Sequence, residues 1–270
     1  MELYTRTSYT LSDTLTKRYS TSFSMSMRLF PIEMRAHIAA IYGMVRLADE
    51  IVDSYDGPDR GPLLDDFEDE VKAAVQRGYS TNPIIHSYAL TAKRYDISNT
   101  LVTAFFHSMR MDLTKQTYDQ ATYETYIHGS AEAVGLMCLY VFVDNPKQYA
   151  ALEKDAARLG AGYQKVNFLR DIKSDHESLG RWYFPFSSFD QFDEAAKARI
   201  TRDIEKDFQA GYRSALKLPI SSQRAVLLSI RYYSLLLKNI KRTPAATLKT
   251  TRVRVSTPRK LIFFIGALFR

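Results

Sequence analysis

The stretch from residue 160 to residue 185 carries the pattern that most constrains how this chain folds. Within it, Asn167, Asp171 and Asp175 stand at intervals of four residues. Four residues turn an α-helix only about 40° beyond a full circle, so these side chains share one face. Gln164 borders that face, and Gly180 is typical of a helix end. We predict a helix with two carboxylates and an amide in line, packed on a core by four apolar residues: Val166, Phe168, Leu169 and Ile172.

A second stretch, residues 41–53, shows a matching pattern. Tyr42, Arg46, Asp49 and Asp53 fall within about 60° of one another on a helix, apart from an apolar stripe. The chain is therefore expected to contain two helices that each carry a pair of aspartates. If the two helices face each other, four carboxylates converge on one cavity.

The remaining sequence also favours helices. Glycine and proline number only 11 and 9 in 270 residues. We find no repeat and no linker long enough to divide the chain, so we expect an all-α fold and one domain over residues 1–270. The aspartate helix that contains residues 41–53 is expected to span 32–54. The further helices are predicted at residues 8–29, 63–77, 83–93, 98–115, 120–143, 190–214 and 221–240, with a short one from about 256. The acidic run within 63–77 is interpreted as a solvated helix face.

The composition excludes several classes of protein. The single cysteine, Cys138, rules out a disulfide framework and a cysteine metal cluster, and it is typical of a reducing compartment. No signal-peptide pattern is visible, so a cytoplasmic location is expected. The five histidines lack the HExxH spacing of metalloproteases, and the chain has neither the GxSxG elbow of hydrolases nor a Walker loop.

The net charge of +7 comes with a concentration of basic residues near the end of the chain. Such an excess fits polyphosphate substrates, an anionic membrane surface or nucleic acid. No zinc finger or RNA-binding strand motif occurs, so no nucleic-acid partner is expected. The apolar tail at residues 261–269 is too short to span a bilayer. Contact with a membrane surface and packing on the body of the protein both remain open for it.

The aspartate pairs suit the binding of a diphosphate through metal ions. Mg²⁺ is typically held by one or two carboxylates together with the phosphates of a substrate. Arg46, Arg170 and Arg181 stand close to the aspartates in sequence and could stabilise the diphosphate as a leaving group. Hydroxyls in residues 19–24 could bind phosphate oxygens, although ordinary surface serines fit that run equally well. The many small residues of 120–143 indicate close helix packing or room for an apolar ligand.

Five segments in the same order and spacing resemble the squalene/phytoene synthase family of head-to-head prenyltransferases. They are residues 42–53, 109–113, 126–137, 164–175 and 180–185, within a resemblance from about Ser20 to Leu261. Val45 stands where the family often has a cysteine, on a side of the helix away from the aspartates.

The resemblance implies an isoprenoid synthase fold around a central cavity, with Mg²⁺, or Mn²⁺ in its place, held by Asp49, Asp53, Asn167, Asp171 and Asp175. It implies that catalysis depends on the four aspartates, Arg46 and Tyr126. The residues expected to contact the substrate are Ser20, Ser22, Phe23, Tyr42, Arg46, Ala131, Val134, Gly135, Gln164, Asn167, Arg170, Arg181 and Tyr233. Among these, the resemblance implies that Ala131, Val134 and Gly135 line an apolar tunnel for the prenyl tails.

Within the family, the opening at 16–24 and the segment 126–130 look most like bacterial phytoene synthases. The expected reaction joins two geranylgeranyl diphosphates into phytoene through a cyclopropylcarbinyl diphosphate, in carotenoid biosynthesis. The alternatives are squalene or dehydrosqualene synthesis from farnesyl diphosphate, with NADPH needed only for squalene. A non-catalytic assembly factor for membrane complexes is a further alternative, which the four intact aspartates disfavour. The oligomeric state stays open.

Overall fold

The structure is a computed structural model that describes residues 2–114, 117–143 and 145–255, except for the side chains of Thr21 and Ser22. Within these ranges the fold is helical, and an isolated parallel bridge pairs Thr117 with Trp182. The helices are α1 (Glu2–Tyr19), α2 (Thr21–Met27), α3 (Ile32–Asp53), α4 (Arg60–Arg77), α5 (Pro83–Arg94), α6 (Asn99–Thr114), α7 (Gln120–Ile127), the π-helix η1 (His128–Glu132), α8 (Ala133–Val143), α9 (Pro146–Leu179), α10 (Glu194–Ala215), α11 (Ile220–Arg242) and α12 (Ala245–Leu248). The predicted all-α fold is confirmed.

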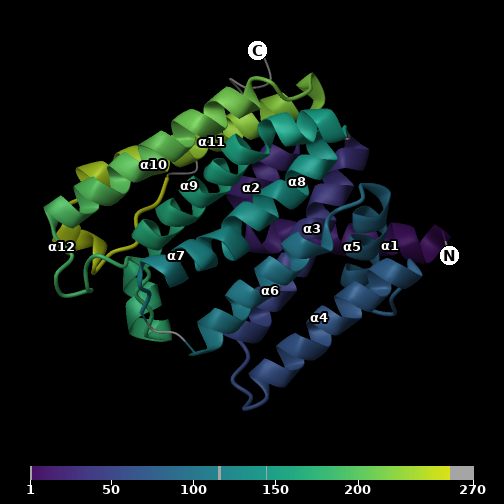
Figure 1. Ribbon diagram of the computed structural model, residues 1–270, viewed down its shortest axis with the longest axis horizontal. Helices are drawn as coiled ribbons and strands as arrows, with labels where there is room; N and C mark the ends of the chain where they lie inside the picture. Colours follow the sequence, from purple (N-terminus) through teal and green to yellow (C-terminus); the bar gives the residue numbers. More distant parts are fainter. Residues whose placement is uncertain (1, 115–116, 144, 256–270) are drawn as a thin grey trace.

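The centre of the fold is α9, which runs between α10 and α11 on one side and α8 on the other (Figure 1). Asn145 caps its start by accepting hydrogen bonds from the backbone N–H groups of Lys147 and Gln148, at 3.0 and 3.1 Å. Gly180 ends it with a φ of +65°, which glycine adopts without strain. The 34 residues span about 50 Å, long enough to cross the whole bundle.

The predicted helix over 8–29 is wrong in one respect, because the chain breaks at Ser20. The Ser20 hydroxyl accepts a hydrogen bond of 3.3 Å from the backbone N–H of Phe23 and starts α2 as an N-cap. A serine side chain competes with the helix backbone in this way, which the hydrophobic periodicity of the stretch does not reveal. The short helix expected from about residue 256 lies outside the described residues.

The predicted helix over 120–143 exists, but it contains a π-helical turn at His128–Glu132. At this turn Gly129 lies against the carbonyl of Ala104 in α6, and Gly160 of α9 lies against the carbonyl of Ala131. Two neighbouring helices therefore approach this segment closely, at points where only glycine fits.

The same continuous helix, Gln120–Val143, is long and apolar enough to cross a membrane by length and composition, and no other such helix occurs among the described residues. It packs against α3, α6 and α9 in the middle of the bundle. Burial against these helices accounts for its apolar character without a membrane.

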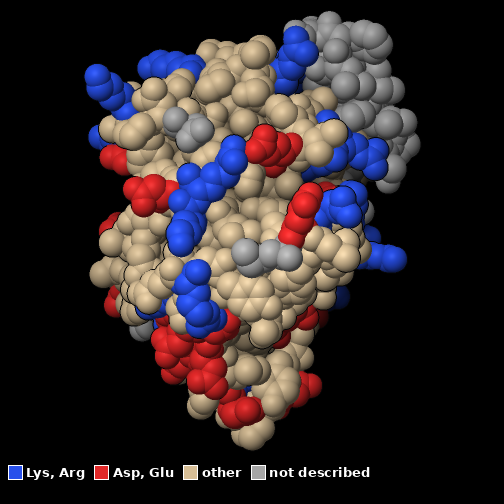
Figure 2. Space-filling view, turned by 90° about the vertical axis from the view of Figure 1, so that its right-hand side faces the viewer, with Lys and Arg blue, Asp and Glu red and all other residues tan. Residues whose placement is uncertain are grey.

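Acidic side chains gather over the lower part of the molecule in Figure 2, the part to which α4 belongs in Figure 1. Asp65, Asp66 and Asp69 are exposed there, as expected for a solvated face. Glu68 differs, because it is buried and lies 2.6 Å from both Lys72 and Arg110. Two basic partners allow its charge to be buried between α4 and α6.

Candidate active site

Carboxylates from three helices meet at one end of the bundle. Burial raises the pKa of Asp49 in α3 to about 7, with further contributions from Asp53 and from Asp112 of α6. Burial likewise raises the pKa of Asp175 in α9 to about 8, with Asp171, Asp53 and Asp112 adding to the effect. These carboxyl groups lie close enough for their charges to act on one another. They belong to five residues: Asp49, Asp53, Asp112, Asp171 and Asp175. The expectation that the two aspartate pairs converge is thus met, and Asp112 joins them.

The positions of these aspartates in their helices add to the unfavourable charge. Asp53 is the last residue of α3, and Asp175 lies near the end of α9. The C-terminal end of a helix carries a partial negative charge, so it disfavours carboxylates and attracts cations. The site is therefore expected to bind cations.

Arg181 is the buried cation of this cluster, only 5% exposed. One guanidinium nitrogen lies 2.8 Å from Asp53 Oδ1, and another donates to the Asp112 carbonyl oxygen at 3.0 Å. Its position directly after the Gly180 turn brings the end of α9 to α3 and α6. The sequence placed Arg181 among the substrate-binding residues, and the structure places it among the aspartates.

Asp112 is a site residue that the sequence reasoning did not assign. Its carboxylate accepts hydrogen bonds from the hydroxyls of Tyr126 at 2.7 Å, Tyr118 at 3.2 Å and Tyr183 at 3.3 Å. The three rings lie 5.1 to 5.2 Å apart, centroid to centroid. A lone aspartate has no spacing that would mark it. Its only signal in the sequence is its place in the segment 109–113, one of the five that carry the resemblance.

Arg46 is held along α3 by its own neighbours. Its Nε donates to Glu50 Oε1 at 2.9 Å, its Nη1 lies 3.6 Å from Asp49 Oδ2, and its guanidinium stacks over the Tyr19 ring at 4.4 Å. Glu50 thus fixes the direction of the Arg46 side chain.

Asp171 is bound by two arginines. Arg170 donates from Nε to both carboxylate oxygens, at 3.0 and 3.1 Å. Arg252, which follows α12 far along the chain, places its Nε 2.7 Å from Asp171 Oδ1. The sequence reasoning noted Arg252 only as part of the basic end of the chain.

The other predicted contacts of the substrate lie in aromatic and amide surroundings. Tyr233 donates to Asn167 Oδ1 at 3.4 Å, and the Asn167 amide reaches Gln164 Oε1 at 3.5 Å. Phe23 stacks on Tyr42 with 5.4 Å between ring centroids. The Ser22 side chain, also predicted to bind substrate, lies outside the described residues.

The small residues predicted to line a tunnel lie at helix contacts. Ala131 is buried at the crossing with Gly160, and a methyl group on Gly135 would lie 3.7 Å from the Ala156 carbonyl oxygen. Val134 is partly buried against the core. Their role in lining a tunnel stays a prediction.

The arrangement of the carboxylates decides how a metal ion can bind at this site. Among the described residues, no group of three or more His, Cys, Asp or Glu side chains is close enough to hold a metal ion alone. The residues nevertheless fit Mg²⁺ shared with a diphosphate, because burial and, to a smaller extent, neighbouring carboxylates raise the pKa values of Asp49 and Asp175, and a bound cation would favour their charged forms.

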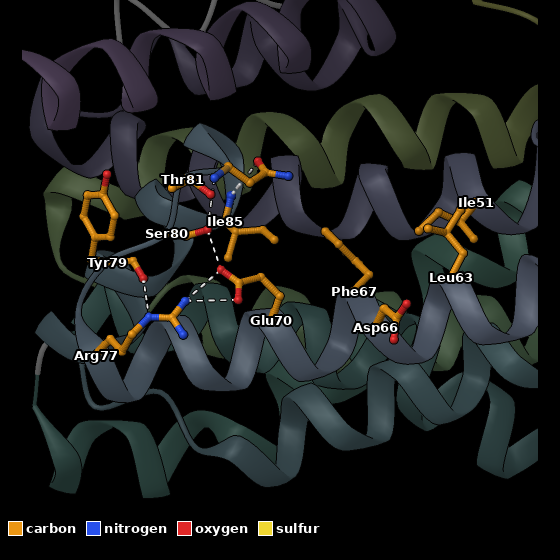
Figure 3. A pocket seen from close by; sticks show the side chains of 11 residues that line it. Ile51, Leu63, Asp66, Phe67, Glu70, Arg77, Tyr79, Ser80, Thr81 and Ile85 are labelled. Carbon is orange, nitrogen blue, oxygen red and sulfur yellow. Dashed lines mark hydrogen bonds and ion pairs between the residues drawn. The ribbon is translucent and has the colours of Figure 1, made fainter.

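Two surface pockets lie elsewhere. One, of about 490 Å³, is formed where α4 and the start of α5 meet Ile51 of α3, and Figure 3 shows Glu70 of its wall paired with Arg77 and Ser80. The other, of about 900 Å³, lies between α10 and α11. Neither is lined by any of the five aspartates.

Comparisons with known proteins identify the family and the fold of this chain. Residues 16–259 match the family described as squalene/phytoene synthase. The chain is 33% identical over 193 residues to presqualene diphosphate synthase of Zymomonas mobilis, covering 69% of this chain and 62% of that protein. It is 25% identical over 220 residues to phytoene synthase of Mycobacterium tuberculosis, covering 80% and 69%. A dehydrosqualene synthase crystal structure superposes with a TM-score of 0.84 at 17% identity, covering 98% of this chain and 96% of that one.

Proposed function

This chain belongs to the squalene/phytoene synthase family and is a prenyltransferase, and we propose that it joins two geranylgeranyl diphosphates head to head into phytoene. In the first step one allylic diphosphate ionises, and the double bond of the second molecule attacks the cation. Loss of a proton closes a cyclopropylcarbinyl diphosphate and leaves one diphosphate free. This intermediate ionises in turn and releases its diphosphate, and the cation rearranges and loses a second proton to give the linear hydrocarbon.

The observation that carries the proposal is the convergence of Asp49, Asp53, Asp112 and Asp175 beside Arg181. An excess of carboxylates near the ends of helices suits the retention of a diphosphate by cations. Ionisation of the substrate then needs only a stabilised leaving group and a site without water.

The aspartates Asp49, Asp53, Asp171 and Asp175, with Asn167, would hold Mg²⁺ here. The metal ion supplies Lewis-acid stabilisation of the departing diphosphate. Arg46 and Arg170 supply further positive charge, each already oriented by a carboxylate. These side chains bind and orient the diphosphate, while no side chain is required to attack the substrate.

Tyr126 is proposed to face the carbocation. Its hydroxyl proton is committed to Asp112, so the phenolic oxygen presents its lone pairs, and the ring its π-face, to a developing positive charge. A donor hydrogen bond to the substrate is excluded while this contact persists.

The length of the prenyl chain distinguishes the two candidate substrates, geranylgeranyl and farnesyl diphosphate. The higher identity to presqualene diphosphate synthase favours, as a second candidate, the use of two farnesyl diphosphates to give a C30 product. The relatives matched by sequence include a presqualene diphosphate synthase and phytoene synthases, so both candidates stand.

The deciding experiment incubates the purified protein with Mg²⁺ and either farnesyl or geranylgeranyl diphosphate, with and without NADPH, and identifies the products by mass. A C40 hydrocarbon formed without NADPH supports phytoene synthesis. A C30 product or presqualene diphosphate moves the chain to the second candidate. No product from either substrate, from a folded protein, contradicts both and favours the assembly-factor alternative.

The protein is proposed to work in the cytoplasm at a membrane surface, because its substrates and product are lipids. The apolar tail at 261–269 that would make this contact lies outside the described residues. Removal of residues 256–270 is expected to lower co-sedimentation with anionic phospholipid vesicles, and unchanged sedimentation would contradict the idea.

A further inference from the structure

The carboxylate of Asp171 differs from those of its neighbours in the number of cations that it already binds. Arg170 contacts both of its oxygens, and Arg252 contacts Oδ1 at 2.7 Å and Oδ2 at 3.4 Å. The carboxylate of Asp175, one turn further along α9, has no hydrogen bond or ion pair with any described residue, and Arg181 acts on it only at longer range. One carboxylate of the pair is therefore occupied, and the other is available.

Arg252 reaches Asp171 from a segment that is tied to the body on both sides. Residues 243–255, which we call the C-terminal strap, include α12. Lys197 Nζ donates to the Thr243 carbonyl at 2.6 Å, and the Ala245 N–H donates to Glu194 at 2.6 Å. Val255 is buried at the far end of the strap. The strap therefore holds the Arg252 guanidinium beside the Asp171 carboxylate.

The contact itself is exposed enough to be broken. The Arg252 side chain is 50% exposed, whereas Asp171 is 17% exposed. Ion pairs with a solvated partner contribute little net stability, so a divalent cation that needs the same oxygens can displace the arginine. Arg170, which is partly buried and adjacent in sequence, keeps its place more firmly.

We propose that Arg252 is a displaceable counter-ion that occupies the metal position of Asp171, so that Arg252 and a divalent cation compete for this carboxylate. The inference rests on the proposed metal-diphosphate site and specifies how it fills. Asp175 has no ion pair to give up when a metal ion binds, whereas binding at Asp171 requires that Arg252 moves away.

The test measures metal binding by the full-length protein without substrate. Mn²⁺ is titrated into wild type, Arg252→Gln and Arg254→Gln, and free Mn²⁺ is followed by electron paramagnetic resonance. Arg254→Gln is the matched control, because it removes the same charge from an exposed residue of the strap. Arg254 has no ion pair with a described residue. Arg252→Gln is expected to bind Mn²⁺ about 3- to 10-fold more tightly, and Arg254→Gln within about 2-fold of wild type.

A second variant shows that the gain arises at Asp171. The double variant Asp171→Asn, Arg252→Gln should bind Mn²⁺ no more tightly than Asp171→Asn alone, because the carboxylate for which the two cations compete is gone in both. Circular dichroism and thermal unfolding check that each variant is folded.

The outcomes separate this inference from the proposed function. Equal or weaker Mn²⁺ binding by Arg252→Gln, in a protein whose wild type binds Mn²⁺, overturns the competition and leaves the metal site standing. An equal gain in Arg254→Gln also overturns it, since the effect would then be one of general charge. Absence of binding in wild type, Arg252→Gln and Arg254→Gln overturns the competition, since Asp171 would then bind no metal ion without a diphosphate, and it leaves a metal site shared with a diphosphate standing.

Discussion

The hydroxyl of Tyr126 donates a hydrogen bond of 2.7 Å to Oδ2 of Asp112, and the same aspartate lies against Arg181, which holds Asp53. A buried carboxylate thus connects the aromatic wall of the site with its aspartates. Asp112 is a positioning residue in this arrangement, because it acts through Tyr126 and Arg181.

Asp112→Asn should lower kcat/KM by about 10- to 100-fold, the usual cost of losing a partner that orients a functional side chain. The amide keeps the shape but loses the charge that faces Arg181 and one acceptor for the tyrosines. The loss should appear mainly in kcat, because the diphosphate contacts of Arg46 and Arg170 remain. Tyr118→Phe, which removes only one of three hydroxyls, is the control and should cost less than 10-fold. Equal kinetics for Asp112→Asn and wild type would contradict the positioning role.

Asp49→Ala and Asp171→Ala should each abolish turnover while the protein stays folded. Each change removes a carboxylate expected to bind the metal and diphosphate, and loss of one such electrostatic contact typically costs at least about 10²- to 10³-fold. Turnover is measured by product mass, and folding by circular dichroism. Asp69→Ala, an exposed aspartate of α4, is the control and should leave activity unchanged. Full activity in either site variant would refute the assignment.

Gly129→Ala should destabilise the protein, and Gly135→Ala should not. A methyl group at Gly129 would overlap the carbonyl oxygen of Ala104 in the backbone of α6, whereas at Gly135 its nearest neighbours lie at 3.7 Å. Overpacking against a rigid backbone costs about 1–3 kcal/mol or more, while alanine at a helical site with space is neutral or stabilising by up to about 1 kcal/mol. Urea unfolding of the two variants measures the difference, and similar midpoints would contradict the close helix crossing.

His37 should make stability depend on pH. Burial lowers the pKa of this histidine to about 4, with Arg94 adding to the effect and Glu33 opposing it. The unfolded chain, with a histidine pKa near 6.5, therefore binds more protons between about pH 4 and 6.5, so the contribution of His37 to stability is complete above pH 6.5 and lost as the pH falls to 4.

The loss attributed to His37 is on the order of 1–3 kcal/mol. Urea unfolding at pH 7.5 and 4.5 measures it, with His37→Gln as the comparison that removes only this titration. The wild type should lose more stability over this interval than the variant. Equal losses would show that His37 is not protonated selectively in the unfolded chain.

The sequence by itself determined the helices and the positions of the aspartates along them. Intervals of four residues place Asp49 beside Asp53 and Asp171 beside Asp175 on any α-helix, whatever surrounds it. Gly180 and Asn145 likewise define the ends of α9 through local backbone chemistry. Such features depend on neighbours within a few residues, so periodicity reveals them. The break at Ser20 is also local, but the apolar pattern does not register a hydroxyl that caps a helix.

Only the tertiary structure decided which side chains join the aspartates. Asp112 meets Tyr183 across 71 residues, Arg181 meets Asp53 across 128, and Arg252 meets Asp171 across 81. No local periodicity connects residues that far apart, because their meeting depends on how α3, α6, α9 and the C-terminal strap pack together. The carboxylates are determined by spacing along single helices, and their counter-ions and hydrogen-bond donors by packing between them.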